Sequence, residues 1–402
     1  MRSVPCWWRS VFLSAFLRGL AAAFLCVLLT TPALAAPKYP LSTRGPDIVD
    51  ARGAKVRLVS VNWFGAESGE FVVGGLDRQP LEKIVKTVKA GGFNSVRLPW
   101  SNELVERNPV VEDRYLAANP KLKGKTALAV FDAVVDEIGR QGLMVVLDNH
   151  RSRGDWCCDE AHGDGLWWTP AYPESAWLAD WKTVTARYAN RPFVVAAELR
   201  NEIRPDPSLG LKPAWGGGDP RTDWRAAAMR GAAAVQAVNP KLLIIVGGID
   251  YQSNLRGVRE APVSLSVPDK LVYAAHDYAW THKPEDLADP ALFARVAHER
   301  WGFVRDPGQP FTAPVYMSEW GGCTQNGPDG QPCKSDRIAF VQALATYARE
   351  SGIDWAWWPL NGTQSAGYNR TAGAVEPYGL LDPTWGRWAD PKVIEALTGV
   401  AP

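Results

Sequence analysis

Polar and aromatic side chains gather at the ends of several short apolar runs along the chain, and they are the residues best suited to do chemistry. A single glutamate in such a place is more often an ion-paired or solvent-exposed group, because ionisable side chains are rarely buried without a partner. The whole set is harder to dismiss, because two carboxyl groups held together can divide the work of nucleophile and proton donor. In chain order the set is Arg97, His150, Asn201, Glu202, His276, Tyr278, Glu319 and Trp358.

Eight apolar runs must position these side chains if they are to meet. Most of the runs are continuous in Val, Ile, Leu and Ala, which is typical of strands covered on both faces of a parallel sheet. Stretches of helical period separate them, so the sequence predicts an α/β fold, a (β/α)₈ TIM barrel whose strand carboxyl ends share one face. An open doubly wound sheet is disfavoured, because no Gly-x-Gly-x-x-Gly follows the first run. The runs are Val56–Trp63, Asn94–Trp100, Met144–His150, Val194–Asn201, Leu242–Gly248, Leu271–Tyr278, Pro314–Gly321 and Asp354–Asn361.

The segments between the runs predict both the helices and the functional face. One helix is expected to begin after Pro80 and to stop at Gly91, and the crossover Tyr251–Pro268 is the least helical. We expect residues 36–56 to close the bottom of the barrel or to form a small hairpin. Four long insertions follow strand ends, on the face where barrels carry their chemistry. They are Arg151–Pro173, Ile203–Thr222, Gly322–Lys334 and Gly362–Asp390, and the other expected helices span Thr126–Gly142, Glu174–Tyr188, Asp223–Val238, Asp289–Val304 and Asp336–Glu350.

The N-terminus is typical of an export signal. Arg2, Arg9 and Arg18 precede or flank an apolar stretch, Leu20–Leu29, and Ala33-Leu34-Ala35 is a small-x-small cleavage site. We therefore predict a signal peptide over residues 1–35, a secreted protein, and a single catalytic domain over residues 36–402. The alternative is an uncleaved anchor, which the short apolar run disfavours.

Net charge and tryptophan content indicate which classes of molecule the protein could bind. Removing the signal takes the formal net charge from +1 to −2, and no run of like charges stands out. Nucleic acid and, after cleavage, membranes are therefore poor partners. The mature chain keeps 17 of 19 tryptophans. Such a number suits a carbohydrate-binding surface, because the apolar face of a pyranose lies flat on an aromatic ring.

The strand-end residues resemble those of the family 5 glycoside hydrolases, the retaining cellulase family of the 4/7 clan. The most specific elements are Asn201-Glu202 at the end of the fourth run and Glu319 at the end of the seventh, and the likeness extends from Asn62-Trp63-Phe64-Gly65 to Trp358. The resemblance implies that Glu202 is the acid/base and Glu319 the nucleophile. It also implies supporting roles: Asn201 binds the sugar 2-hydroxyl, Arg97 and Tyr278 support the nucleophile, His150 and His276 line the cleavage subsite, and Trp358 is its stacking platform.

Retaining hydrolysis independently demands residues of these types. It needs two carboxyl groups roughly 5–5.5 Å apart, one attacking the anomeric carbon while the other protonates the leaving oxygen. We expect Arg97 to favour the charged form of Glu319. The charge of Glu319 should in turn keep a proton on Glu202, because adjacent carboxylates resist joint ionisation.

Four cysteines remain after the signal is removed, and an exported chain favours disulfides. Cys323 and Cys333 share one loop, so we expect them to pair; the competing pattern would cross from the loop after the third run to the loop after the seventh, on the opposite side of the ring. For Cys157 and Cys158 we favour a vicinal bond over two free thiols. A zinc site at Cys157, Cys158, Asp159, Glu160 and His162 is disfavoured, because adjacent cysteines do not match zinc-ligand spacing. No metal or cofactor is predicted.

The leading functional hypothesis is a monomeric, endo-acting β-1,4-glucanase acting on a β-linked polysaccharide. Several tryptophans at strand ends or in the following loops should line its groove, among them Trp63 and Trp168. A β-mannanase or a xyloglucanase of the same family is the nearest alternative. A non-catalytic glycan-binding barrel is the alternative from another class, and it would lack one of the two carboxylates.

Overall fold

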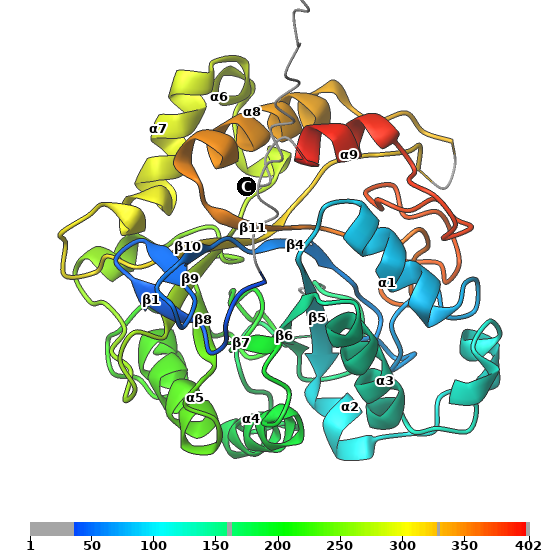
Figure 1. Cartoon of the computed structure of the whole chain (residues 1–402). Helices are drawn as coiled ribbons and strands as arrows, with labels where there is room; N and C mark the ends of the chain where they lie inside the picture. Colours follow the sequence, from blue (N-terminus) through cyan, green and yellow to red (C-terminus); the bar gives the residue numbers. More distant parts are fainter. Residues whose placement is uncertain (1–35, 159–162, 328–329, 399–402) are drawn as a thin grey trace, which may run out of the picture. The chain divides into compact units, whose positions relative to one another are not determined.

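A closed barrel of eight parallel strands forms the centre of the molecule. The computed structural model describes residues 36–158, 163–327 and 330–398, so the predicted signal peptide lies outside the described residues. The strands follow one another around the ring in the order β10-β11-β4-β5-β6-β7-β8-β9, and the prediction of a (β/α)₈ barrel is confirmed (Figure 1). They are β4 (Val59–Asn62), β5 (Ser95–Ser101), β6 (Met144–Arg151), β7 (Val194–Glu198), β8 (Leu243–Gly247), β9 (Leu271–His276), β10 (Val315–Trp320) and β11 (Asp354–Trp357).

Helices cover the outside of the ring, as Figure 1 shows. Pro80 precedes α1 (Leu81–Ala90) and Gly91 ends it, as the sequence signals predict. The crossover after β8 holds only a short 3₁₀ helix, η3 (Arg256–Arg259), which agrees with its weak helical pattern. The other α-helices of the described residues are α2 (Asn102–Arg107), α3 (Ala127–Arg140), α4 (Glu174–Tyr188), α5 (Trp224–Val238), α6 (Pro284–Ala288), α7 (Pro290–Arg300), α8 (Ser335–Ser351) and α9 (Pro391–Thr398).

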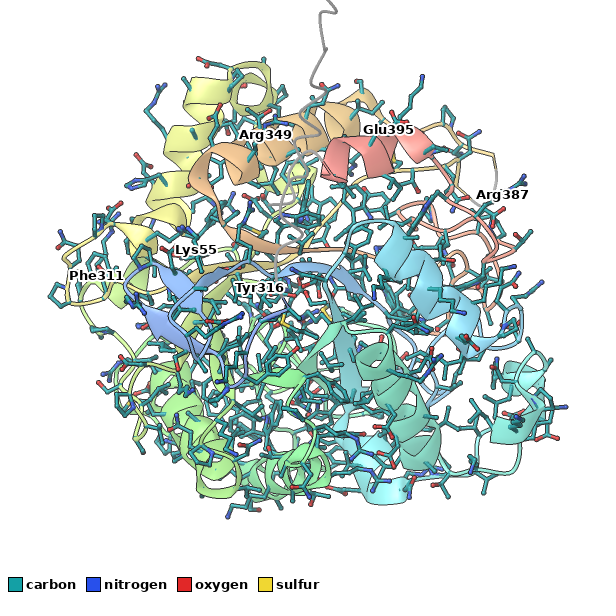
Figure 2. The ribbon with its side chains drawn as sticks, viewed as in Figure 1. Lys55, Phe311, Tyr316, Arg349, Arg387 and Glu395 are labelled. Carbon is teal, nitrogen blue, oxygen red and sulfur yellow. A yellow bond between two sulfur atoms is a disulfide. The ribbon has the colours of Figure 1, made fainter. Side chains whose placement is uncertain are left out.

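A small antiparallel sheet covers the amino-terminal end of the barrel. Its strands are β1 (Ser42–Arg44), β2 (Asp47–Val49) and β3 (Lys55–Val56), so the segment both forms a hairpin and closes the barrel bottom. Leu41 and Ile48 join a buried apolar cluster with the side chains at the bottom of the strands. Tyr316 of β10 belongs to this cluster, and Figure 2 shows it within the ring of strands, whereas Arg349 and Glu395 lie on the outer helices.

A second and larger core lies between the strands and the surrounding helices, and it contains most of the buried tryptophans. None of the helices in the described ranges is long and apolar enough to cross a bilayer. Apolar side chains thus fill the bottom of the barrel and the layer between strands and helices. This leaves the carboxyl-terminal end of the barrel for the polar residues.

Candidate active site

Arg97 of β5 is the centre of a fully buried ion cluster at the carboxyl end of the barrel. Its Nη1 donates to Glu319 Oε1 at 2.8 Å, and its Nε and Nη2 donate to the two oxygens of Glu198 at 2.7 and 3.1 Å. Asp148 Oδ2 lies 3.1 Å from Nη2. Three carboxyl groups surround this one guanidinium, whose five donors in a fixed fork suit such a site.

Glu319 at the end of β10 is held through both carboxylate oxygens. Arg97 binds Oε1, and the Tyr278 hydroxyl donates to Oε2 at 3.1 Å. Asn201, just after β7, accepts a hydrogen bond from Arg97 through Oδ1 at 2.9 Å. Its amide nitrogen remains directed at His150 Nε2, 3.4 Å away. The same guanidinium therefore fixes both Glu319 and Asn201.

Glu202 lies opposite Glu319 and has a backbone φ of +46°, in the left-handed region that few non-glycine residues adopt. Its Oε1 contacts His276 Nδ1 at 2.9 Å. One carboxylate oxygen of Glu202, one of Glu319 and a ring nitrogen of His276 all lie within 4.8 Å of one another. The two carboxyl groups are therefore close enough to act on one glycosidic bond, as retaining hydrolysis requires with carboxyl groups about 5–5.5 Å apart.

The hydrogen bonds around His276 require a proton between His276 and Glu202. The Ser318 hydroxyl donates to Glu198 Oε1 at 2.9 Å, so it must accept from His276 Nε2 at 3.0 Å. Nε2 therefore carries a hydrogen, and the Nδ1 contact with Glu202 needs a further one. That proton belongs either to the imidazolium or to the Glu202 carboxyl.

Arg97 lowers the pKa of Glu319 as expected, but the net pKa shifts of the two carboxyl groups are opposite to those expected from the sequence. Burial raises the pKa of Glu319 to about 7, against the opposing charges of His276 and Arg97. Burial also acts on Glu202, but the hydrogen bond and charge of His276 outweigh it and hold the pKa of Glu202 below its usual range. His276, which Arg97 alone does not account for, lies against both carboxyl groups, with Nδ1 2.9 Å from Glu202 Oε1 and 3.6 Å from Glu319 Oε2. The three groups titrate as one coupled unit.

His150 and Trp358 form one wall of the site. Their rings are stacked, with centroids 5.4 Å apart and an angle of 7° between the planes. His150 Nδ1 contacts Asp148 Oδ2 at 2.6 Å. Burial, reinforced by the charge of Arg97, holds the pKa of His150 well below its usual range, so the ring is neutral and donates to Asp148 through Nδ1. Its Nε2 is then free to accept from Asn201.

A cavity of about 740 Å³ opens over these residues, a size typical of small-molecule sites. The tryptophans on its wall are Trp156, Trp280 and Trp358. Trp280 is 58% exposed and lies parallel to Tyr278, with ring centroids 4.4 Å apart. All eight strand-end residues of the sequence argument except Arg97 line the cavity: His150, Asn201, Glu202, His276, Tyr278, Glu319 and Trp358.

Two predicted platforms lie elsewhere. Trp63 is 0% exposed and its Nε1 donates to Gly74 O at 2.9 Å, so the prediction that it binds substrate is wrong. Trp168 is half-buried and lines a separate hollow beside Glu174 and Arg230. Other strand-end tryptophans are also core residues, including Trp100 and Trp320. A sequence does not distinguish an indole packed beneath a loop from one facing a groove.

The cysteines fall in two different environments. Cys157 and Cys158 line the cavity, with their Sγ atoms 3.7 and 2.9 Å from Glu202 Oε2. Cys323 and Cys333 have Cα atoms 5.6 Å apart, within the usual disulfide range. In each of the two predicted pairs, Cys157 with Cys158 and Cys323 with Cys333, the two cysteines lie close together. The sequence did not predict that Cys157 and Cys158 lie against Glu202, the acid/base candidate.

Two groups in the described ranges bring three metal-ligating side chains together, and both contain Glu202. One adds Cys157 and Cys158, and the other adds His276 and Glu319. The Glu202, His276 and Glu319 atoms are already engaged in the hydrogen bonds described above. Asp159, Glu160 and His162, considered for zinc, lie outside the described residues.

Several residues of the site were missed or given no role from the sequence. Glu198 is the single charged residue in an otherwise apolar strand, a signal that could have identified it. Asp148 offers a similar signal in β6. Gln252, in the loop after β8, accepts a hydrogen bond from the Glu202 backbone at 2.6 Å, and nothing in its sequence context marks it.

Comparison with known proteins gives a consistent family. The family model for cellulase (glycosyl hydrolase family 5) matches residues 49–364. An endoglucanase from Paenibacillus polymyxa is 31% identical and covers 87% of this chain and 84% of its own. The major extracellular endoglucanase of Xanthomonas campestris pv. campestris is 32% identical, over 83% of this chain and 69% of its own.

Solved structures agree with this result. The catalytic domain of the major Xanthomonas endoglucanase has a TM-score of 0.75 at 28% identity, covering 90% of this chain and 99% of that domain. A hyperthermophilic endocellulase from Pyrococcus horikoshii has a TM-score of 0.76 at 25% identity, covering 91% of this chain and 100% of that one. The chain belongs to glycosyl hydrolase family 5 and is a glycoside hydrolase.

Proposed function

We propose that this chain is an endo-acting β-1,4-glucanase that hydrolyses cellulose-type polysaccharides with retention of anomeric configuration. The observation that carries the proposal is the pairing of Glu202 and Glu319, within 4.8 Å and across one open cavity. The endoglucanases among its relatives support the same substrate class.

Glu319 is the nucleophile of this proposal. Arg97 and Tyr278 hold its two oxygens, which fixes the direction of attack on the anomeric carbon. The bond from sugar to leaving oxygen breaks as a covalent glycosyl–Glu319 ester forms. Bound sugar would displace water from the cavity, and the guanidinium then favours the charged carboxylate more strongly.

Glu202 is the acid and then the base. The proton held between His276 Nδ1 and Glu202 Oε1 is the one delivered to the leaving oxygen. In the second step Glu202 accepts a proton from the water that cleaves the ester, so the same residue serves both half-reactions. Asn201 contributes by binding the 2-hydroxyl, an interaction that strengthens in the transition state.

The aromatic wall of the cavity gives the substrate its subsites. Trp358, stacked on His150, is the platform of the cleavage subsite, and Trp156 and Trp280 add further aromatic surface to the cavity lining. A structure of the Pyrococcus endocellulase was determined with cellotetraose, a β-1,4-linked oligosaccharide, which supports the same class of ligand here.

The chain is further proposed to be secreted after cleavage at Ala35 and to act as a monomer. Residues 37–402 cluster as one compact unit, which supports a single catalytic domain. Edman sequencing of culture-medium protein should begin at Ala36, and light scattering should give the mass of one chain. A product that keeps residue 1, or a dimer mass, would refute the corresponding part.

The disulfides belong to the same proposal, as Cys323–Cys333 and Cys157–Cys158. Peptide mapping of unreduced protein is the test. A fragment that joins either of Cys157 and Cys158 to the other loop would overturn the pairing. Two alkylatable thiols at Cys157 and Cys158 would overturn only the vicinal bond.

Activity on defined polymers tests the function itself. Carboxymethyl cellulose should lose viscosity much faster than it gains reducing ends, because an endo-acting enzyme cuts internal bonds. Activity on mannan, xylan and xyloglucan should be lower. A preference for mannan or xyloglucan would assign the chain to those activities, and proton NMR showing the α-anomer as first product would exclude retention.

A further inference from the structure

The loop after β8 contains an unusual backbone conformation. Asp250, Tyr251 and Gln252 are consecutive non-glycine residues with φ values of +55°, +59° and +58°. Such residues rarely adopt this region, and strained conformations persist only where the surrounding structure enforces them. Here the Tyr251 N–H donates to Ile203 O at 3.1 Å, which ties the turn to the residue after Glu202.

The turn directs the Gln252 side chain into the protein, where it is completely buried. Space for it depends on Gly247 at the end of β8. A Cβ added at Gly247 would lie 2.5 Å from Gln252 Cδ, closer than packed atoms can approach. The side chain does not line the cavity, so it cannot touch bound sugar.

The side-chain amide of Gln252 and its backbone carbonyl all form hydrogen bonds with residues of the site. Oε1 accepts from the Glu202 backbone N–H at 2.6 Å. Nε2 donates to Glu198 Oε1 at 3.1 Å and lies 3.4 Å from Ser318 Oγ. The Gln252 carbonyl accepts from His276 N at 3.1 Å. One side chain and its backbone thus join the ends of β7, β9 and β10.

We propose that Gln252 is a positioning residue that sets the place of the acid/base Glu202 relative to Glu319. The assignment rests on the proposed function of the carboxyl pair. The amide is suited to the task because it accepts on one side, from a backbone N–H, and donates on the other, to a carboxylate. Methionine offers neither bond, and an ionised glutamate offers only the acceptor.

The effect should fall on proton transfer rather than on binding. We expect Gln252→Met to lower kcat/KM for cellotetraose by about 100-fold, the typical result of a small misplacement of a catalytic group. An aryl cellobioside with a good leaving group needs little protonation, so its kcat/KM should fall much less. KM for cellotetraose should stay near the wild-type value.

Gln252→Glu provides a second and independent readout. Its carboxyl would lie beside Glu198, which raises its pKa and keeps it protonated, and so able to donate, at acid pH. The ratio of its activity to that of the wild type should therefore be highest at acid pH and fall as the pH rises.

Gln236→Met is the matched control. Gln236 is also a buried glutamine, and its amide bonds only the backbone of Val267, at 3.2 and 3.1 Å. The Gln236→Met variant should lose thermal stability, and any fall in its activity should be the same for both substrates.

Equal losses of kcat/KM on both substrates for Gln252→Met, or a pH-independent activity ratio for Gln252→Glu, would overturn the proposal. If Gln252→Met fails to fold, the Gln252→Glu profile decides alone, and a wild type without cellulase activity would refute the proposed function instead.

Discussion

The two ends of the barrel are built from the same strands, but their interiors are filled by opposite kinds of side chain. At the amino-terminal end the interior is filled by apolar side chains and closed by β1, β2 and β3. At the carboxyl-terminal end it is filled by a buried guanidinium with three carboxyl groups around it. Buried ion clusters seldom stabilise a fold as well as apolar packing of the same volume. The carboxyl-terminal end, called the upper end from here on, is therefore arranged for chemistry, and the amino-terminal or lower end for stability.

The change from an apolar to a charged interior can be followed along one strand, β6. In β6 the inward-facing side chains run from Met144 and Val146 in the lower apolar cluster to Asp148 and His150 in the site. Successive inward residues are two positions apart, as the pleat of a strand requires. Only two positions along the strand, from Val146 to Asp148, therefore separate the apolar core from the charged one.

Removing the central cation of the upper end should have the largest effect. Arg97→Met leaves Glu198, Asp148 and Glu319 without their shared partner, so we expect a loss of roughly 3–5 kcal/mol in the free energy of unfolding. Turnover should fall by at least about 1,000-fold, because Glu319 loses its main hydrogen bond. Denaturant unfolding and cellotetraose kinetics measure the two losses. An Arg97→Met enzyme with wild-type turnover would contradict the role of the cluster.

A truncation at the lower end should separate stability from activity. Ile245 of β8 is fully buried in the lower cluster, so Ile245→Ala should cost about 2–5 kcal/mol of unfolding free energy. Its kcat below the melting temperature should equal that of the wild type. A large fall in kcat for folded Ile245→Ala would show that the two ends are not independent.

The titration of the upper end should shape the pH profile. Burial raises the pKa of Glu319 to about 7, so kcat/KM should rise as the pH increases through this value and the nucleophile loses its proton. At higher pH it should fall, when the proton between His276 and Glu202 is lost. His276→Gln removes the cation that most opposes the raised pKa of Glu319. The acid limb should then move to higher pH, and an unmoved limb would refute the coupling.

The smallest effect is expected at the rim of the upper end. Trp280→Ala removes an exposed platform on the cavity wall and should raise KM for cello-oligosaccharides several-fold with little change in kcat. Trp63→Phe is the buried counterpart, and it should lower the melting temperature without changing KM. Equal KM values for Trp280→Ala and the wild type would remove Trp280 from the binding surface.

The sequence predicted the barrel well because all eight strands are buried on both faces, and continuous apolar runs record that burial. It also located the residues of the cavity, because they sit at the ends of those runs. Trp63 was misplaced because burial of an indole depends on the loop that covers it. The direction of the pKa shift of Glu202 was misjudged because it depends on the 2.9 Å contact with His276. Gln252 was missed because an irregular turn, which leaves no periodic pattern in the sequence, brings its side chain inward.

Trapping the covalent intermediate tests the central claim most directly. A 2-deoxy-2-fluoro cellobioside with an activated leaving group should inactivate the enzyme, because the fluorine slows hydrolysis of the glycosyl ester more than its formation. Proteolysis and mass spectrometry should then find the sugar on Glu319. Label on Glu202, or on any residue other than Glu319, would contradict the assignment of nucleophile and acid/base.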